Sequence, residues 1–250
     1  RAGQVAQADD LIDVAALLDA YASLHPDASL PAQQVVFGTS GHRGSALDAA
    51  FNDDHIAAAT QAIVEYRRAN GISGPLFIGR DTHALSQPAW ETAIEVLVAN
   101  DVAVVIDTFD RVTPTPAISH AILTYNRGRA RTDAGRADGI VVTPSHNPPR
   151  DGGFKYNPPD GGPAGTDITA GVQARANELL RQRLDGVKRT AFVSAIQACA
   201  RHDFVTTYVD DLPNVVNIGA IRDAGLHVGA DPLGGASVDF WAAIADRHRI

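Results

Sequence analysis

The feature of this sequence that most restricts its fold is an alternation of strand-like apolar runs with helix-like segments. Apolar runs occupy residues 75–81, 102–107 and 139–145. Amphipathic segments at residues 86–101 and 115–126 separate them. Strands that alternate with helices in this way form a sheet whose faces the helices cover. The sequence therefore predicts an α/β protein.

The same rhythm extends in both directions from this central part. An Asp-capped amphipathic helix is expected at residues 9–24, and a short buried strand at 33–38. A long helix at residues 51–71 has Asn52 as its cap and ends at Gly71. Further along, we expect an ordered hairpin-like loop with a strand at 154–157, a helix at 166–184, and a strand, Gly-rich turn and helix over 226–248.

The restart of the strand, turn and helix pattern after about residue 190 indicates a second unit. We predict a three-layer α/β/α domain with a mixed sheet at residues 1–195. The beginning of a second, similar α/β domain should follow at residues 196–250.

Composition restricts the class of protein. The chain is 45% hydrophobic and 20% charged, which suits a globule with a large core, and its net charge of −8 disfavours nucleic acid as a partner. No apolar run reaches the roughly 18 residues of a membrane helix, and the N-terminal residues lack the apolar core of a secretory signal. We therefore expect a cytoplasmic protein. The single cysteine, Cys199, lies on a helix-like face and is expected to be a buried structural thiol.

Three loops that follow predicted strands have unusual compositions: FGTSGHRGS, GRDTHALS and VVTPSHNPPRDGGFKYNPP. In open α/β sheets, ligands bind beyond the carboxyl ends of the strands. The first loop combines glycines, hydroxyls and Arg43, a composition that can hold a phosphate or form an ordinary Gly-rich turn. In the second, Arg80 and Asp81 could brace a neighbouring loop or form a helix-capping turn. The segment ADPLGGAS could cradle an anion, but it is interpreted as a tight turn before a helix.

Ser145 stands just after a predicted strand, in the proline-rich segment TPSHNPP. It could be a turn residue, a hydrolase nucleophile or a phosphoryl acceptor. The G-x-S-x-G pattern of the hydrolases is absent, and the adjacent His146 should project away from Ser145. A phosphoryl acceptor needs nearby cations, which Arg43, Lys155 and His146 can supply. The residues favour the phosphoryl acceptor.

FGTSGHRG, GRDTHALS, TPTPA, ADPLGG and the long block ADGIVVTPSHNPPRDGGFKYNPPDGGPA resemble the bacterial phosphoglucomutases of the α-D-phosphohexomutase superfamily. The resemblance spans nearly the whole chain, and the block around Ser145 is its most specific part. It implies four domains around a central cleft, of which this chain would hold the first and part of the second. It also implies that these residues alone are incomplete for catalysis.

The resemblance implies a role for each matching residue. Ser145 would carry the phosphoryl group that exchanges with glucose 1-phosphate and glucose 6-phosphate through glucose 1,6-bisphosphate. Its phosphate would bind Mg2+ with three aspartates of a loop that this sequence lacks, since Asp107–Arg111 has the wrong spacing. Lys155, or in competition His146, would move a proton or stabilise the substrate oxygen. The remaining residues implied at the phosphate site are Arg43, Thr39, Ser40, His42 and Asn147.

Alternative functions remain open at this point. A relative acting on mannose or glucosamine phosphates would share this half of the protein, and a non-catalytic sugar-phosphate-binding fragment is a further possibility. In each case the expected partner is a small sugar phosphate, and the expected assembly is a monomer or homodimer.

Overall fold

The computed structural model describes residues 3–38 and 41–250, so the predictions for Thr39 and Ser40 lie outside the described residues. At its centre the described chain forms a seven-stranded mixed sheet with the order β1-β2-β6-β5-β3-β4-β7. This architecture confirms the predicted α/β class. The strands are β1 Phe37–Gly38, β2 Gly41–Ser45, β3 Leu76–Arg80, β4 Val104–Asp107, β5 Asp138–Val142, β6 Asp151–Asn157 and β7 Ala200–His202.

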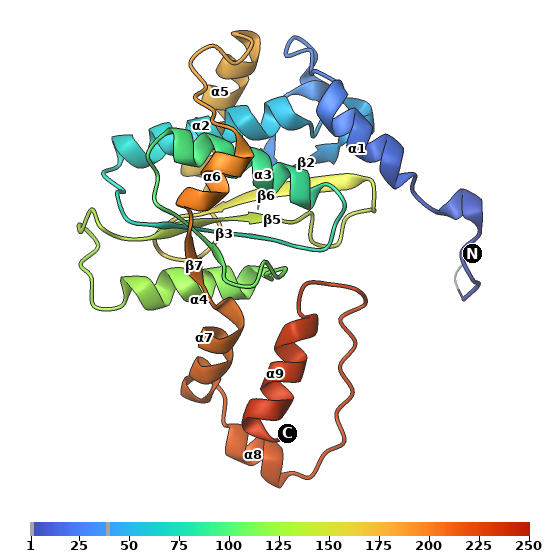
Figure 1. Cartoon of the computed structure of the whole chain (residues 1–250), viewed down its shortest axis with the longest axis vertical. Helices are drawn as coiled ribbons and strands as arrows, with labels where there is room; N and C mark the ends of the chain where they lie inside the picture. Colours follow the sequence, from blue (N-terminus) through green and yellow to red (C-terminus); the bar gives the residue numbers. More distant parts are fainter. Residues whose placement is uncertain (1–2, 39–40) are drawn as a thin grey trace.

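Helices cover both faces of the sheet (Figure 1). On one face lie α1 Val14–Ser23, α2 Asp53–Ala69, α3 Ser86–Ala99, α5 Thr166–Arg181 and α6 Phe192–Ala198. On the other face lies α4 Thr115–Asn126, against which α7 Phe204–Asp211 packs. Of two further helices, α8 Ile218–Asp223 lies beyond α7, and α9 Val238–His248 packs beside α7. Short 3-10 turns occur at Ala8–Asp10, Pro31–Gln33, Ala46–Asp48 and Leu212–Asn214.

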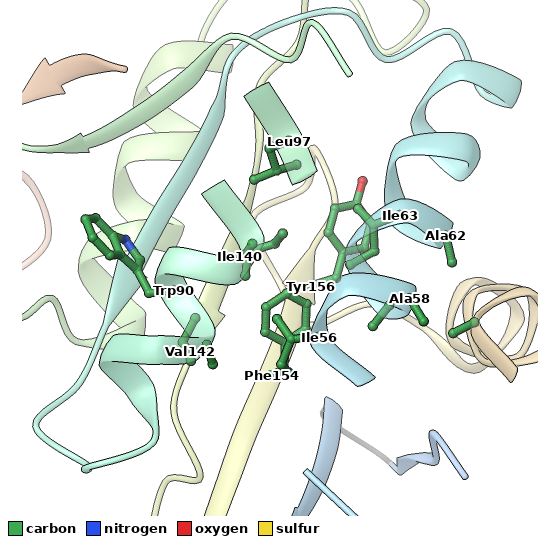
Figure 2. Close-up of a cluster of buried hydrophobic side chains, with 14 of the residues drawn as sticks. Ile56, Ala58, Ala62, Ile63, Trp90, Leu97, Ile140, Val142, Phe154 and Tyr156 are labelled. Atoms are coloured by element: carbon green, nitrogen blue, oxygen red, sulfur yellow. The ribbon is translucent and has the colours of Figure 1, made fainter. Parts of the chain in front are cut away.

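The central strands are apolar on both sides because each side faces a helical layer. Ile140 and Val142 of β5 belong to the core beneath α2 and α3, whereas Val141 between them packs on the α4 side. Figure 2 shows Ile63 of α2 and Leu97 of α3 around the first of these cores. Burying one such side chain contributes about 1.5–3 kcal/mol. Both faces therefore fix the position of β5, which leads directly into the Ser145 loop.

Strand direction brings the unusual loops together. β3 pairs in parallel with β4 and with β5, and Arg80 lies opposite Val142 at the carboxyl ends of their strands. β6 returns antiparallel to β5 and places Lys155 opposite Val141. β2 pairs antiparallel with β6, with Arg43 opposite Gly153. The residues that follow β3 and β5 therefore emerge at the same edge of the sheet as the loop between β5 and β6.

Several local predictions are confirmed. Asn52 forms the N-cap of α2, and Gly71, with a φ of 64°, follows its end. The segment after Ser145 is an ordered hairpin, with residues 154–157 inside β6. Cys199 is buried, and burial raises the pKa of its thiol to about 11, which confirms a structural cysteine. In the described ranges, every helix is too short or too polar to cross a bilayer.

The segment at residues 37–45 differs from the expected loop. Its described residues form β1 and β2, and the strand expected at 33–38 is reduced to Phe37–Gly38. The physical reason is the free edge of β6, whose backbone groups pair with Gly41–Ser45. Local composition favoured a turn, but a neighbouring strand supplied the hydrogen bonds.

The C-terminal part also differs from expectation. β7 lies beyond residue 195 and still joins the central sheet through parallel pairing with β4. The sheet therefore extends across the predicted boundary between residues 195 and 196, and the division into two domains there stays a prediction. The strand predicted at the start of residues 226–248 does not form, and Leu226 and Val228 are each 70% exposed. A strand needs a neighbouring backbone, and no described strand lies beside this segment.

Candidate active site

A cavity of about 610 Å³ opens at the carboxyl edge of the sheet, within the size range of small-molecule sites. Four segments that are far apart in the sequence form its wall. They are Asp81–His83 after β3, Thr113–Pro116 before and within α4, Thr143–Ser145 with Asn147 after β5, and Pro232–Ala236 before α9.

Ser145 is the exposed nucleophilic residue of this wall. Its backbone is left-handed, with a φ of 70°, a conformation that costs energy for a residue with a side chain. Its N–H donates to Oγ1 of Thr143 at 3.0 Å. Its own hydroxyl makes no hydrogen bond to the part of the chain that the structure describes, so the oxygen is available for chemistry.

The loop that carries Ser145 is held from several sides. Nε of Arg43 donates to the carbonyl oxygen of Pro144 at 3.3 Å, directly before the serine. Nδ2 of Asn147 donates to a carboxylate oxygen of Asp151 at 3.2 Å. At the far end, Nε2 of His83 and the carbonyl oxygen of Pro149 are 2.6 Å apart. These contacts fix the unusual backbone of the serine loop.

The absence of a side chain at Gly41 allows β2 to lie close to β6. Gly41 has a φ of 129°, and a β-carbon on it would lie 2.5 Å from the carbonyl oxygen of Phe154 and 2.7 Å from Cγ of Lys155. Only glycine can occupy such a position. The approach places Arg43 of β2 beside both Lys155 and the serine loop.

Lys155 is partly buried, with Arg43 and Asp81 as its charged neighbours. Burial lowers the pKa of its ammonium group, the positive charge of Arg43 lowers it further, and the carboxylate of Asp81 opposes both effects. A lysine with a lowered pKa can transfer a proton more readily than an exposed one. A negatively charged group bound nearby would raise that pKa again.

Asp81 lines the cavity in an ordered turn. Its Oδ1 accepts from the N–H of His83 at 2.9 Å and from the hydroxyl of Ser86 at 2.6 Å, while its own N–H donates to the carbonyl oxygen of Val142 at 3.1 Å. The turn therefore both precedes α3 and attaches to β5. Arg80 points elsewhere: its guanidinium lies 4.4 Å over the Trp90 ring and bonds to Asp110.

The first turn of α4 forms another part of the wall. Pro114 is the N-cap of α4, and Thr115 and Pro116 start the helix. The N–H of Thr113 donates to the carbonyl oxygen of Arg80 at 2.8 Å, which fixes this segment to the end of β3. A helix N-terminus carries a partial positive charge and free N–H groups, so it favours an anion in the cavity.

The Gly-rich segment before α9, for which the sequence favoured a tight turn over an anion-binding role, lines the cavity. The expected turn exists, since the N–H of Gly235 donates to the carbonyl oxygen of Pro232 at 2.8 Å. Its position was not foreseen: the hydroxyl of Thr82 donates to the carbonyl oxygen of Gly234 at 2.7 Å and attaches the turn to the rim. The adjacent glycines of ADPLGG were the available signal.

The predicted residues fall into distinct positions. Ser145 and Asn147 line the cavity, and Arg43 and Lys155 lie beside the serine loop. His146 is exposed and is not among the residues that line the cavity.

His42 lies away from the cavity. Its ring is 1% exposed, is stacked on Phe51 and His55, and has its pKa lowered to about 3 by burial and by His55. The buried ring does not line the cavity, so the phosphate-site role of His42 stays a prediction, and its contacts suit a residue that shapes the β2 segment. It acts as a core residue of β2.

The site also differs in what it offers to a metal ion. The described residues contain no group of three or more His, Cys, Asp or Glu side chains that could hold a metal ion. Asp107 is occupied by Arg111, whose Nε and Nη2 lie 3.1 Å and 2.9 Å from its two carboxylate oxygens. Asp107 is thus paired with Arg111 in the structure.

Comparison with known proteins gives a consistent result. The family model for "Phosphoglucomutase/phosphomannomutase, alpha/beta/alpha domain I" matches residues 34–183. The chain is 55% identical to a phosphoglucomutase of Komagataeibacter xylinus over 251 residues, which is 100% of this chain and 45% of that relative. It is 31% identical to a phosphoglucosamine mutase of Pectobacterium atrosepticum over 144 residues, 58% of this chain and 29% of the relative.

The fold is similar to that of a solved structure as well. The exocytosis-sensitive phosphoprotein pp63/parafusin (phosphoglucomutase) of Paramecium, in its open form, superimposes with a TM-score of 0.68 and 20% identity. The superposition covers 88% of this chain and 42% of that one. The chain therefore spans less than half the length of these proteins.

Proposed function

The chain belongs to the phosphoglucomutase/phosphomannomutase family, and from that membership we propose that it is the phosphoserine-bearing part of a phosphoglucomutase, an isomerase. The observation that carries the proposal is Ser145. Its free hydroxyl lines a cavity of suitable size, on a backbone held in a strained conformation by neighbouring groups.

The proposed reaction is an intramolecular phosphoryl shift. The phosphoserine P–O bond breaks as the 6-hydroxyl of glucose 1-phosphate forms a new bond to phosphorus, and the hydroxyl proton passes to a base. The resulting glucose 1,6-bisphosphate reorients, and its O1–P bond breaks as Oγ of Ser145 bonds to that phosphorus. The serine proton passes to O1, which leaves glucose 6-phosphate and the phosphoserine. Such transfers depend mainly on alignment and charge stabilisation.

The surroundings of Ser145 can supply alignment and charge. We assign Lys155 to the substrate hydroxyl, as proton acceptor or electrostatic partner, because burial and the charge of Arg43 lower its pKa and because Asp81 is also a charged neighbour. Arg43 holds the carbonyl before Ser145 and contributes positive charge. His146 stays the competing proton carrier, although it does not line the cavity.

Phosphate binding is proposed for the cavity wall. The N-terminus of α4 at Thr115 and the amide of Asn147 present donors there. Asp81 opposes an anion by its charge, and we assign it to the orientation of Lys155. Thr39 and Ser40 keep the phosphate-site role implied by the family resemblance.

Mg2+ is the proposed cofactor. Within the described ranges the residues do not form a complete metal site, so the chain offers only the phosphate of Ser145 as a ligand that the family resemblance supports. The aspartate ligands are proposed to lie outside this chain. When bound, the ion would balance part of the phosphate charge.

Glucose phosphates are favoured over mannose or glucosamine phosphates because identity is 55% to a phosphoglucomutase and 31% to a phosphoglucosamine mutase. A non-catalytic sugar-phosphate-binding fragment is the second candidate, favoured by the incomplete metal site. We propose a cytoplasmic protein, monomeric or homodimeric, that acts on small sugar phosphates and, with its net charge of −8, does not bind nucleic acid.

The proposal is tested by following Ser145 itself. The protein is incubated with glucose 1,6-bisphosphate and Mg2+, and peptide mass spectrometry locates any added phosphoryl group. Glucose 6-phosphate formation from glucose 1-phosphate is measured in parallel, with mannose and glucosamine 1-phosphates as competing substrates. Ser145→Ala should abolish both signals, whereas Ser23→Ala, at an exposed helix end, should keep them.

Phosphorylation of a different residue, or full turnover by Ser145→Ala, contradicts the proposal. Phosphorylation of Ser145 without turnover agrees with the proposal that the aspartate ligands lie outside these residues, whereas sugar-phosphate binding without phosphorylation of Ser145 indicates the non-catalytic fragment.

A further inference from the structure

His83 connects two loops that both contribute residues to the cavity wall. It lies in the turn after β3, and its side chain reaches the end of the serine loop, where Nε2 is 2.6 Å from the carbonyl oxygen of Pro149. The family resemblance assigned no role to this residue.

The hydrogen bonds of the ring define its tautomer. Nδ1 accepts from the N–H of Leu85 at 3.1 Å. A ring nitrogen that accepts a hydrogen bond uses its lone pair and carries no proton. The proton of the neutral ring is therefore on Nε2, which donates to Pro149. One ring thus caps its own turn with one nitrogen and holds the serine loop with the other.

The main chain of His83 strengthens the connection. Its N–H donates to Oδ1 of Asp81 at 2.9 Å, and Asp81 in turn is a charged neighbour of Lys155. The turn that contains His83 is fixed to β5 through the Asp81 N–H and Val142 contact of 3.1 Å. The hydrogen bond from His83 to Pro149, called the brace below, therefore starts from a turn that is fixed to a strand of the sheet.

The other side-chain contacts of the serine loop do not hold its Pro149 end. Arg43 holds the loop at Pro144, and the exposed pair of Arg150 and Asp48 lies beyond Pro149. Among the described residues, His83 is the side chain that bonds to the carbonyl of Pro149. Without it, the Pro148–Pro149 part of the loop would be held less firmly relative to Asp81 and Lys155.

We propose that His83 is a positioning residue: its Nε2–H fixes the serine loop against the Asp81 turn, so that Ser145 and Lys155 keep the relative placement that phosphoryl transfer needs. The part concerning phosphoryl transfer rests on the proposed function. The structural part concerns the loop alone.

Two substitutions distinguish the contribution of the Nδ1 contact from that of the Nε2 contact. His83→Asn keeps an acceptor near Nδ1 for the Leu85 N–H but cannot reach Pro149. His83→Gln places an amide N–H near the position of Nε2. If the contact to Pro149 matters, His83→Gln should behave like the original protein in hydrogen exchange and phosphorylation, and His83→Asn should not. If His83 only caps its own turn, His83→Asn should behave like the original protein and His83→Gln should not.

Three measurements are made on the full chain and both variants. Nitrogen NMR should show His83 protonated on Nε2. Hydrogen exchange at the amides of Ser145 and Asp151 should be about tenfold faster in His83→Asn and close to the original rate in His83→Gln. The rate at which glucose 1,6-bisphosphate phosphorylates Ser145 should fall about tenfold in His83→Asn, with an unchanged melting temperature.

The outcomes distinguish the two proposals. If the original protein gains no phosphoryl group, the proposed function fails, and the exchange rates still decide whether the brace exists. A ring protonated on Nδ1, equal exchange in all three proteins, or slower exchange in Asn than in Gln overturns the role of His83. Faster exchange in His83→Asn with an unchanged phosphorylation rate shows a brace without a positioning function and also overturns the proposal.

Discussion

Gly153 and Thr143 are hydrogen-bonded neighbours at the start of the serine loop: the N–H of Thr143 donates to the carbonyl oxygen of Gly153 at 2.8 Å. A β-carbon on Gly153 would overlap the carbonyl oxygen of Thr143 and lie 2.5 Å from Cα of Pro144. The absence of a side chain at Gly153 therefore sets how closely the serine loop lies on β6.

Gly153→Ala should displace this loop. Because both overlapping groups are backbone atoms, we expect a loss of about 1–3 kcal/mol in the free energy of unfolding, typical of overpacking. Denaturant titration measures it, and Ser145 phosphorylation should slow in parallel. Gly171→Ala, where a β-carbon meets open space on α5, is the matched control and should stabilise by about 0.5–1 kcal/mol. A stable, fully active Gly153→Ala would contradict this packing argument.

His42→Phe should reduce the acid sensitivity of the fold. Burial lowers the pKa of His42 to about 3, below the 6.5 of an ordinary histidine, so the unfolded chain binds more protons between these values. Stability from this group is present above pH 6.5 and is lost as the pH falls toward 3. Between pH 7 and pH 5 the loss is about 2 kcal/mol.

The phenyl ring of the His42→Phe variant does not titrate and can keep the stack on Phe51. The measurement is the free energy of unfolding at both pH values for the two proteins, so that effects of other groups cancel. An identical pH dependence in the variant would show that folding does not lower the pKa of His42.

Asp138→Asn should destabilise the core between α2 and the sheet. Asp138 is fully buried, burial raises its pKa to about 6, and its Oδ2 lies 2.8 Å from Nε of Arg67 and 2.6 Å from the hydroxyl of Tyr156. Removing the carboxylate leaves the buried guanidinium without a counter-charge, which costs about 3–5 kcal/mol. Thermal unfolding measures the loss.

A second substitution, Arg67→Met, should restore most of the stability of Asp138→Asn, because it removes the unpaired charge. If the double variant is no more stable than the single one, the loss has another cause than the stranded Arg67.

Thr82→Val should release the Gly-rich turn from the cavity rim. The substitution keeps the side-chain volume but removes the hydroxyl that donates to the carbonyl oxygen of Gly234 at 2.7 Å. We expect hydrogen exchange at Gly235 to become several-fold faster, with little change in overall unfolding. Thr82→Ser keeps the donor and should exchange at the original rate; equal protection in Thr82→Val would mean that the turn is held by other contacts.

Local features were readable from the sequence because their physical causes are local. The apolar runs predicted β3, β4 and β5, Asn52 predicted the start of α2, and the proline-rich surroundings of Ser145 predicted an exposed, restrained hydroxyl. Each depends on residues within a few positions of one another, so periodicity and capping chemistry are sufficient.

Features that depend on pairing between distant segments could not be predicted in the same way. Whether residues 41–45 form a strand depends on the free edge of β6, and whether the start of residues 226–248 forms one depends on a neighbour that the described chain lacks. The burial of His42 follows from β2 facing Phe51 and His55, and not from its Gly-rich surroundings.

By itself, then, the sequence determined the α/β class, most helices and central strands, and the identity of Ser145 as the reactive candidate. The tertiary structure alone decided which segments surround that serine: the Asp81 turn with His83, the start of α4 and the turn at Pro232–Ala236. Strand order and direction bring these segments to one edge of the sheet, and that order is set by the combined packing of many distant residues, which no local pattern records.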